Sequence, residues 1–319
     1  ANTFDSNAVT VGRGGSKIAG LCLDATLGTE GESVTLIYAD STKGWLNVNT
    51  DSTIQGSTYV AATGGTITTS GDYKIHTFTS SGCFQVTNAG NPGGSNKVSY
   101  VVVAGGAGGG FAQTNGSAGG GAGGYREGRD SPKDSYTASP LAATDSGLPV
   151  SVQTYPITIG AGGAGQPSGP PQNGSSGSTT TFSSISSAGG GGGGGCAQIG
   201  VAGGSGGGGG GGIASGKAGG AGNTPPTTPS QGNAGGTGGS PSPDRHGGGG
   251  GGAGAVGESA TPSISGDGGA GATSSINGSA VARAGGGGAS GTPDNSEGDG
   301  GTGGGGPGGD TPGTNQGTA

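Results

Sequence analysis

The sequence predicts an all-β N-terminal region followed by a glycine-rich bundle of packed, extended left-handed helices of the polyglycine II type, with almost no α-helix. Glycine is concentrated in the second part of the chain: of 90 glycines in 319 residues, 15 lie in residues 1–100 and 75 follow residue 104. Unbroken runs of seven glycines occupy residues 189–195 and 206–212. Sustained apolar periodicity of 3.6 residues, the signature of an amphipathic helix, is missing throughout.

The first hundred residues are divided by turn-forming residues into short segments that favour strands. Residues 33–38 (SVTLIY) and 44–49 (GWLNVN) are rich in β-branched and aromatic residues and predict a hairpin. Residues 72–79, 83–88 and 97–104 predict three consecutive antiparallel strands, because their connectors are rich in Gly, Asn and Ser.

The glycine runs predict an ordered lattice rather than a disordered linker. Only 17 of the 216 residues from position 104 onward are charged, which is too few to keep a disordered chain well solvated. Several runs also follow an alanine, as at 104–106, 188–190 and 284–286. Collagen is excluded because no Gly-X-Y register is kept.

A polyglycine II helix has no internal hydrogen bonds, so its N–H and C=O groups must find partners on neighbouring strands. Ordering seven residues costs about 7–14 kcal/mol of backbone entropy, whereas one hydrogen bond contributes about 0.5–1.5 kcal/mol. We therefore expect a run to be ordered only when other runs surround it. Valine at Gly192 or Gly209 is expected to open the lattice, since side chains have no room where backbones touch.

Residues 2–49 resemble a segment found in tail fibres of marine bacteriophages. Residues 71–90 (GDYKIHTFTSSGCFQVTNAG), 98–110 (VSYVVVAGGAGGG) and 119–128 (GGGAGGYREG) resemble the start of the glycine-rich domain at the end of such fibres. The resemblance implies a β-rich fibre-like domain at 1–60. Antiparallel strands then occupy 61–104, and a polyglycine II-type domain with recognition loops occupies 105–319.

The segments between the runs are predicted to lie at the ends of the bundle, where loops on a rigid scaffold carry recognition residues. Two alternatives to receptor contact remain for these segments. The tyrosines could instead pack locally within a long connection, and the isoleucines and valine could be small apolar plugs that close the bundle. The candidate receptor-binding residues are Ile199, Val201, Ile213, Lys217, Arg245, His246, Tyr125 and Tyr136.

Catalytic and metal-binding motifs are missing from the sequence. The two histidines, His76 and His246, are the only imidazole bases, and H-E-x-x-H does not occur. The net charge of −7 and the sparse basic residues argue against nucleic-acid binding. No apolar stretch reaches the length of a membrane span. We therefore expect no enzyme activity, cofactor, metal or membrane insertion.

The function that fits these expectations is the distal, receptor-binding part of a phage tail fibre. Its partners would be a bacterial surface receptor, either a glycan or an outer-membrane protein, and other fibre or tail proteins. The resemblance implies a homotrimer located in the virion and extracellular. The alternatives are an ice-binding polyglycine II protein and a structural glycine-rich extracellular protein.

Overall fold

The computed structural model describes residues 8–27, 34–48, 55–56, 58–91, 93–113, 116–131, 133–143, 145–166, 169–212, 215–239, 245–291 and 297–309. These residues contain strands, turns and extended segments and no helix, as the sequence predicts. The chain divides into two compact units. Unit 1 comprises Ala1–Thr63, Gln85–Val98 and Pro149–Thr154, and unit 2 comprises Gly64–Phe84, Ser99–Leu148 and Tyr155–Ala319.

Unit 1 consists of short antiparallel pairs. Its strands are β1 (Val9–Val11), β2 (Ala25–Leu27), β3 (Leu36–Asp40), β4 (Gly44–Asn47), β5 (Gln55–Gly56), β6 (Val60–Thr63), the second part of β9 (Gly82–Ala89) and β10 (Lys97–Val98). One sheet has the order β1-β2-β5, and β6 pairs with β9.

The predicted hairpin at 33–49 is confirmed as β3 and β4. Its turn is held by the Asp40 carboxylate, which accepts the backbone N–H groups of Thr42 at 2.7 Å and Lys43 at 2.6 Å. Gly44 follows with a φ of +73°, and a Cβ at this position would lie 1.9 Å from the Lys17 carbonyl oxygen. Only glycine therefore fits where this hairpin leaves its turn.

Unit 2 contains the remaining strands and the glycine-rich segments. The strands are β7 (Thr66–Ser70), β8 (Tyr73–Thr77), β11 (Tyr100–Val103), β12 (Tyr125–Gly128), β13 (Ala142–Ala143), β14 (Leu148–Pro149), β15 (Thr154–Thr158), β16 (Thr180–Phe182), β17 (Ile185–Ser187), β18 (Ala272–Ser274) and β19 (Val281–Arg283). A small core of aromatic rings lies among them. The Phe182 ring meets Phe84 at 5.8 Å and Tyr155 at 6.2 Å, both edge to face.

The prediction that 72–79, 83–88 and 97–104 pair consecutively is wrong, although each segment does form a strand. β8 pairs with β7, to which a two-residue turn joins it. β9 pairs with β6, and β11 pairs with β12 across the intervening glycine segments. The local hairpin is the shorter connection for β8, and β11 and β12 are aligned because the segments between them run out and back side by side.

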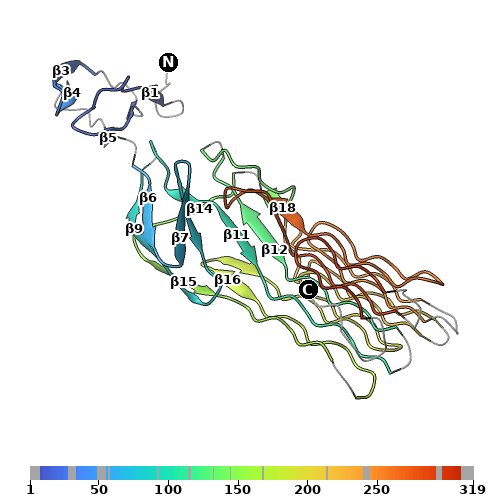
Figure 1. Ribbon diagram of the computed structural model, residues 1–319. Helices are drawn as coiled ribbons and strands as arrows, with labels where there is room; N and C mark the ends of the chain where they lie inside the picture. The colour runs from blue at the N-terminus through green and yellow to red at the C-terminus, as the bar shows by residue number, and fades with distance from the viewer. Residues whose placement is uncertain are drawn as a thin grey trace. The chain divides into compact units, whose positions relative to one another are not determined.

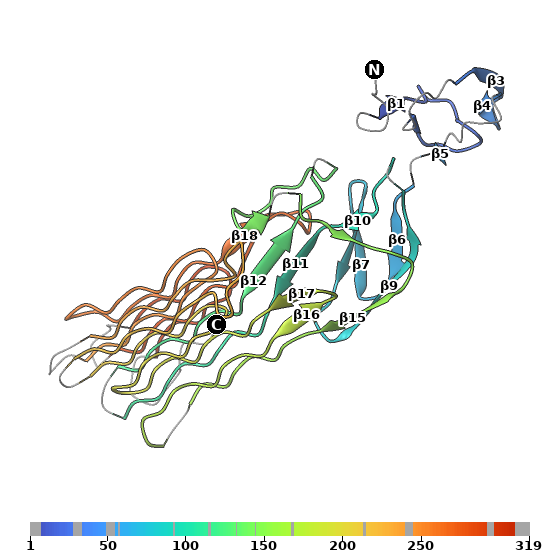
Figure 2. The same ribbon diagram turned by 180° about the vertical axis from the view of Figure 1, so that it is seen from behind.

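Beyond β11 the chain runs back and forth as extended segments that lie side by side (Figures 1 and 2). We call these segments glycine strands. They comprise residues 104–110, 116–124, 161–166, 173–178, 188–195, 198–204, 205–212, 216–222, 232–239, 246–252, 255–260, 265–271, 284–290 and 298–302. No glycine in the runs 189–195 and 206–212 has a positive φ. This backbone is compatible with the left-handed threefold helix that the sequence predicts.

Hydrogen bonds of the run 206–212 repeat every third residue. Gly206, Gly209 and Gly212 donate to the carbonyls of Asn233, Gly236 and Gly239 at 2.9, 2.9 and 3.3 Å. Gly207 and Gly210, also three residues apart, donate to strand 198–204. Gly208 and Gly211 donate to strand 116–124. Successive N–H groups therefore point to three different neighbours, which is the geometry of a threefold helix.

The carbonyl groups of the same run reach three further strands. They accept N–H groups from 246–252, 216–222 and 188–197 at 2.7–3.2 Å. Residues 206–212 thus have six neighbours, and all seven N–H groups are bonded. The predicted lattice is confirmed in this interior run, whose contacts are made by backbone rather than by side chains.

The lattice excludes side chains where backbones touch, as expected, but it admits methyl groups at other positions. Alanine methyl groups lie within it, each at most 2 % exposed, at Ala107, Ala118, Ala122, Ala253 and Ala289. Ala122 still donates to Gly251 O at 3.0 Å, so the hydrogen-bond pattern continues through an alanine. A methyl group fits at these positions, whereas a Cβ at Gly209 would lie 1.8 Å from the Lys217 carbonyl oxygen.

Short polar side chains replace backbone partners at the margins of the lattice. Asn173 Oδ1 accepts the Gly195 N–H at 3.1 Å, and Ser176 Oγ accepts the Gly192 N–H at 3.4 Å. The hydroxyl of Ser290 accepts the Ser117 N–H at 2.8 Å. Because these side chains hold their acceptor atoms near the backbone, they satisfy N–H groups that no further strand reaches.

Candidate functional site

The turns at the far end of the glycine strands lie next to one another in unit 2 (Figure 1). Gly116 donates to Arg245 O, Gly211 donates to Gly116 O and Ala197 donates to Gly211 O. We call this region, around the described residues 111–113, 116–117, 195–198, 211–212, 215–217, 239 and 245–246, the loop end. Predicted recognition segments that are far apart in the sequence therefore meet here.

Arg245 and His246 lie at the loop end with different exposure. Arg245 is half-buried. His246 is only 2 % exposed, and its Nδ1 lies 3.3 Å from Ser265 Oγ, which in turn donates to Ser290 O at 2.7 Å. His246 therefore supports the loop from inside, and a direct contact with a receptor is not open to it.

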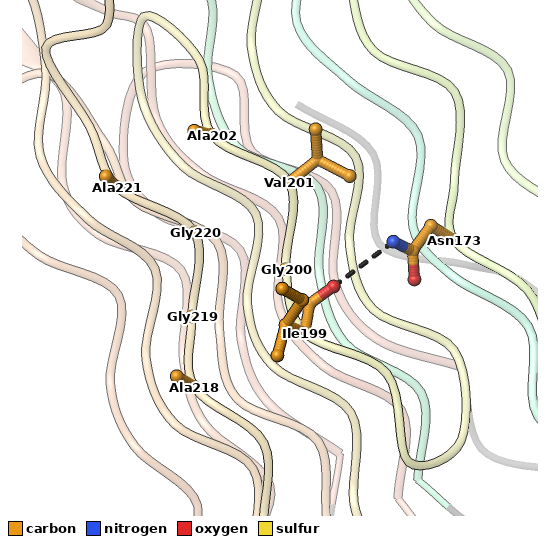
Figure 3. Close-up of a pocket in the computed structure, with 9 residues that line it drawn as sticks. All are labelled: Asn173, Ile199, Gly200, Val201, Ala202, Ala218, Gly219, Gly220 and Ala221. Carbon is orange, nitrogen blue, oxygen red and sulfur yellow. Dashed lines mark hydrogen bonds between the residues drawn. The ribbon is translucent and has the colours of Figure 1, made fainter.

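Ile199 and Val201 lie on strand 198–204 close to the loop end. Ile199 is 63 % exposed and Val201 is half-buried. Both line a shallow groove of about 460 Å³, together with Asn173, Gly200, Ala202, Ala218, Gly219, Gly220 and Ala221 (Figure 3). Lys217 is half-buried and precedes Ala218 in the chain. Two of the predicted residues thus line one groove, Lys217 adjoins it in the chain, and Ile213 lies outside the described residues.

Tyr125 and Tyr136 lie at the opposite end of the glycine strands, beside β12 and β18. Tyr125 is 1 % exposed and packs against Ala253 and Ala272. The Tyr136 ring is half-buried and faces the Arg129 guanidinium, with 5.7 Å between its carbon and the ring centroid. This placement fits local packing, the alternative reading, and leaves no surface on Tyr125 for a receptor.

Glu127 organises this opposite end and is 3 % exposed. Its carboxylate accepts three hydrogen bonds: from Tyr125 Oη at 2.7 Å, Ser139 N at 3.0 Å and Ser274 Oγ at 2.6 Å. Burial and the Glu127 carboxylate raise the pKa of Tyr125, and the same two causes raise the pKa of Tyr136. Both tyrosines therefore stay neutral at physiological pH and serve as packing groups.

Gln231 is a second buried polar anchor, 1 % exposed. Its Oε1 accepts the Ala188 N–H at 2.8 Å, its Nε2 donates to Pro225 O at 2.7 Å, and its carbonyl accepts the Tyr125 N–H at 2.8 Å. Sequence reasoning missed both Glu127 and Gln231. Both residues could have been identified from their positions in the sequence, because each is a long polar residue next to an uninterrupted extended segment.

The described residues contain no cluster of metal-ligating side chains. No group of three His, Cys, Asp or Glu side chains among them is placed to hold a metal ion. None of the three cysteines is in a disulfide; Cys22 and Cys83 are exposed and Cys196 is half-buried. None of the described residues forms a helix long and apolar enough to cross a membrane.

A family model described as a glycine-rich domain matches residues 79–319, about three quarters of the chain. No curated protein and no solved structure matches.

Proposed function

The chain belongs to this glycine-rich domain family, and we propose that it is the distal, receptor-binding part of a bacteriophage tail fibre. In this proposal the protein is extracellular, in the virion, and adheres to a glycan or outer-membrane protein on a bacterial surface. The resemblance of residues 2–128 to such fibres supports the assignment. The protein has no catalytic role in this proposal and needs no cofactor.

The observation that carries the proposal is the separation of scaffold and loops in unit 2. The interior run 206–212 bonds to six neighbouring strands, and at the loop end its residues Gly211 and Gly212 bond to Gly116, Ala197 and Gly239. Because the scaffold is already ordered, the loops bind a receptor with little further loss of conformational entropy. Different loop sequences can be carried on the same lattice.

Exchanging residues 196–199 and 240–245 for unrelated segments of equal length should reduce binding to host cells by about tenfold or more. Gly200, Val201 and His246 are kept, since they belong to the lattice and its support. The measurement is binding of the labelled protein to a panel of marine bacterial strains. The matched control exchanges residues 276–279, the exposed turn between β18 and β19 at the opposite end. Unchanged binding by the loop-end variant, with a folded protein, would contradict the proposal.

Homotrimer formation is part of the proposal and is supported by the surface of unit 1. The β3–β4 hairpin exposes Ile37, Tyr38 and Trp45 by 55, 46 and 38 %. Exposed apolar side chains on one small hairpin are typical of a surface that another chain covers. We expect a mass of three chains in solution, measured by light scattering at micromolar concentration. A stable monomer at that concentration would remove the trimer from the proposal and leave the adhesive role standing.

A further inference from the structure

The groove beside Ile199 lies between two neighbouring glycine strands at the surface of the lattice. Strands 198–204 and 216–222 are bonded to each other through Gly200 N to Ala218 O at 3.0 Å and Gly203 N to Ala221 O at 3.1 Å. Strand 198–204 also bonds to 188–195 and 205–212, which gives it three backbone neighbours where the interior run has six. The groove therefore lies at a side of strand 198–204 where the interior run would have another strand packed against it.

The groove has a glycine floor and small apolar walls (Figure 3). Gly200, Gly219 and Gly220 lie along its base, and Ile199, Ala202, Ala218 and Ala221 are exposed beside it. Asn173 closes one side and is held there by a 3.1 Å hydrogen bond from its Nδ2 to Ile199 O. Among the described residues, none that lines the groove is charged. Its width and chemistry suit a neutral chain with small side chains.

The backbone groups along the groove leave more donors than acceptors unused. In the described residues, the N–H groups of Ile199, Ala202, Ala218, Gly219 and Ala221 have no hydrogen-bond partner. In the same two stretches, residues 199–202 and 218–221, only three carbonyl groups have no hydrogen-bond partner: those of Gly200, Ala202 and Gly219. The unused donors recur at intervals of three, at 199 and 202 on one strand and at 218 and 221 on the other. A partner that fits them carries acceptors with a threefold repeat.

We propose that this groove binds a proline-rich peptide segment in the polyproline II conformation, seated as an additional strand of the lattice. Such a segment has three residues per turn, the repeat of the glycine strands, and its conformation is formed before binding. Proline has no N–H group, so the segment offers acceptors only and matches the excess of donors in the groove. Its rings pack against the alanine methyl groups and Ile199. This inference does not depend on the virion role.

The test uses a blocked, fluorescein-labelled hexaproline peptide and fluorescence anisotropy with the full chain. The peptide made from L-proline should bind saturably, and its mirror image made from D-proline should bind at least about tenfold more weakly. The D-peptide has the same composition and the opposite helix hand, so it is the matched control for nonspecific apolar binding.

Three variants locate the binding site. Ala221→Trp fills the groove and should weaken binding of the L-peptide at least about tenfold. Ala161→Trp, at an exposed alanine of another glycine strand, should leave binding unchanged. Ala202→Pro removes one unused donor from backbone that is already extended, and it should weaken binding about fivefold.

Equal binding of the two enantiomers, or binding of the L-peptide that Ala221→Trp leaves intact, would overturn the proposal. So would an absence of peptide binding up to millimolar concentration. If Ala221→Trp instead lowers the oligomeric state, the groove receives a second copy of this chain. If a bacterial surface polysaccharide binds there and hexaproline does not, the ligand is a glycan. Either result refutes the peptide assignment and leaves the proposed adhesive function untouched.

Discussion

Replacing Gly209 by alanine is expected to destabilise the glycine lattice by at least about 3 kcal/mol. A Cβ there would lie 1.8 Å from the Lys217 carbonyl oxygen and 2.6 Å from that of Ala218. Accommodating it forces strand 216–222 outward, which also stretches the bond from Lys217 N to Gly210 O, now 3.2 Å. Thermal or denaturant unfolding followed by circular dichroism measures the loss.

The matched control is Gly162→Ala. Gly162 lies in glycine strand 161–166, and a Cβ at this position would have its nearest neighbour, the Gly106 carbonyl oxygen, at an ordinary 3.7 Å. The substitution also reduces the freedom of the unfolded chain, so stability should stay within about 1 kcal/mol of the parent or rise slightly. Equal losses in the two variants would show that backbone contact does not determine which glycines are essential.

Replacing Glu127 by alanine is expected to cost about 3–5 kcal/mol. The change leaves the Tyr125 hydroxyl, the Ser139 N–H and the Ser274 hydroxyl without their shared acceptor in an interior position. Because Ser139 and Ser274 belong to different segments, the 133–141 connection and β18 should both loosen. Hydrogen exchange should show faster exchange in these two regions than in the run 206–212.

Ser135→Ala is the control for the Glu127 variant. Ser135 is exposed in the same connection, and its hydroxyl lies 3.3 Å from the Tyr73 hydroxyl. Losing an exposed pair of this kind should change stability by no more than about 0.5 kcal/mol. If Glu127→Ala were equally mild, the buried carboxylate would not be the anchor of this region.

The sequence predicted the lattice because long glycine runs themselves indicate that backbones must be in close contact. It also predicted the β3–β4 hairpin, whose turn residues act locally. Strand pairing was harder to predict: β11 finds β12 only after residues 104–124 have run out and back, and no local signal encodes that return. The positions that admit a buried alanine could not be predicted, because this depends on a few tenths of an ångström in neighbouring strands.

The candidate site was predictable in part for the same reason. Ile199 and Val201 stand out as apolar residues beside a long glycine run, and both line the groove. Tyr125 and His246 looked equally prominent in the sequence, yet both are buried. Exposure depends on which side of the threefold helix a residue occupies, and that rotation is set by the neighbours of the strand rather than by its own composition.

The three-residue repeat of the hydrogen bonds also constrains how such a protein can change length over evolution. One residue inserted into the run 206–212 would turn every following N–H group by a third of a revolution, away from its partner and toward a different neighbour. Three inserted residues restore the original directions and add about 9 Å to the strand. Insertions within a strand are therefore expected to keep the lattice only in units of three codons, whereas the turns between strands should accept single codons.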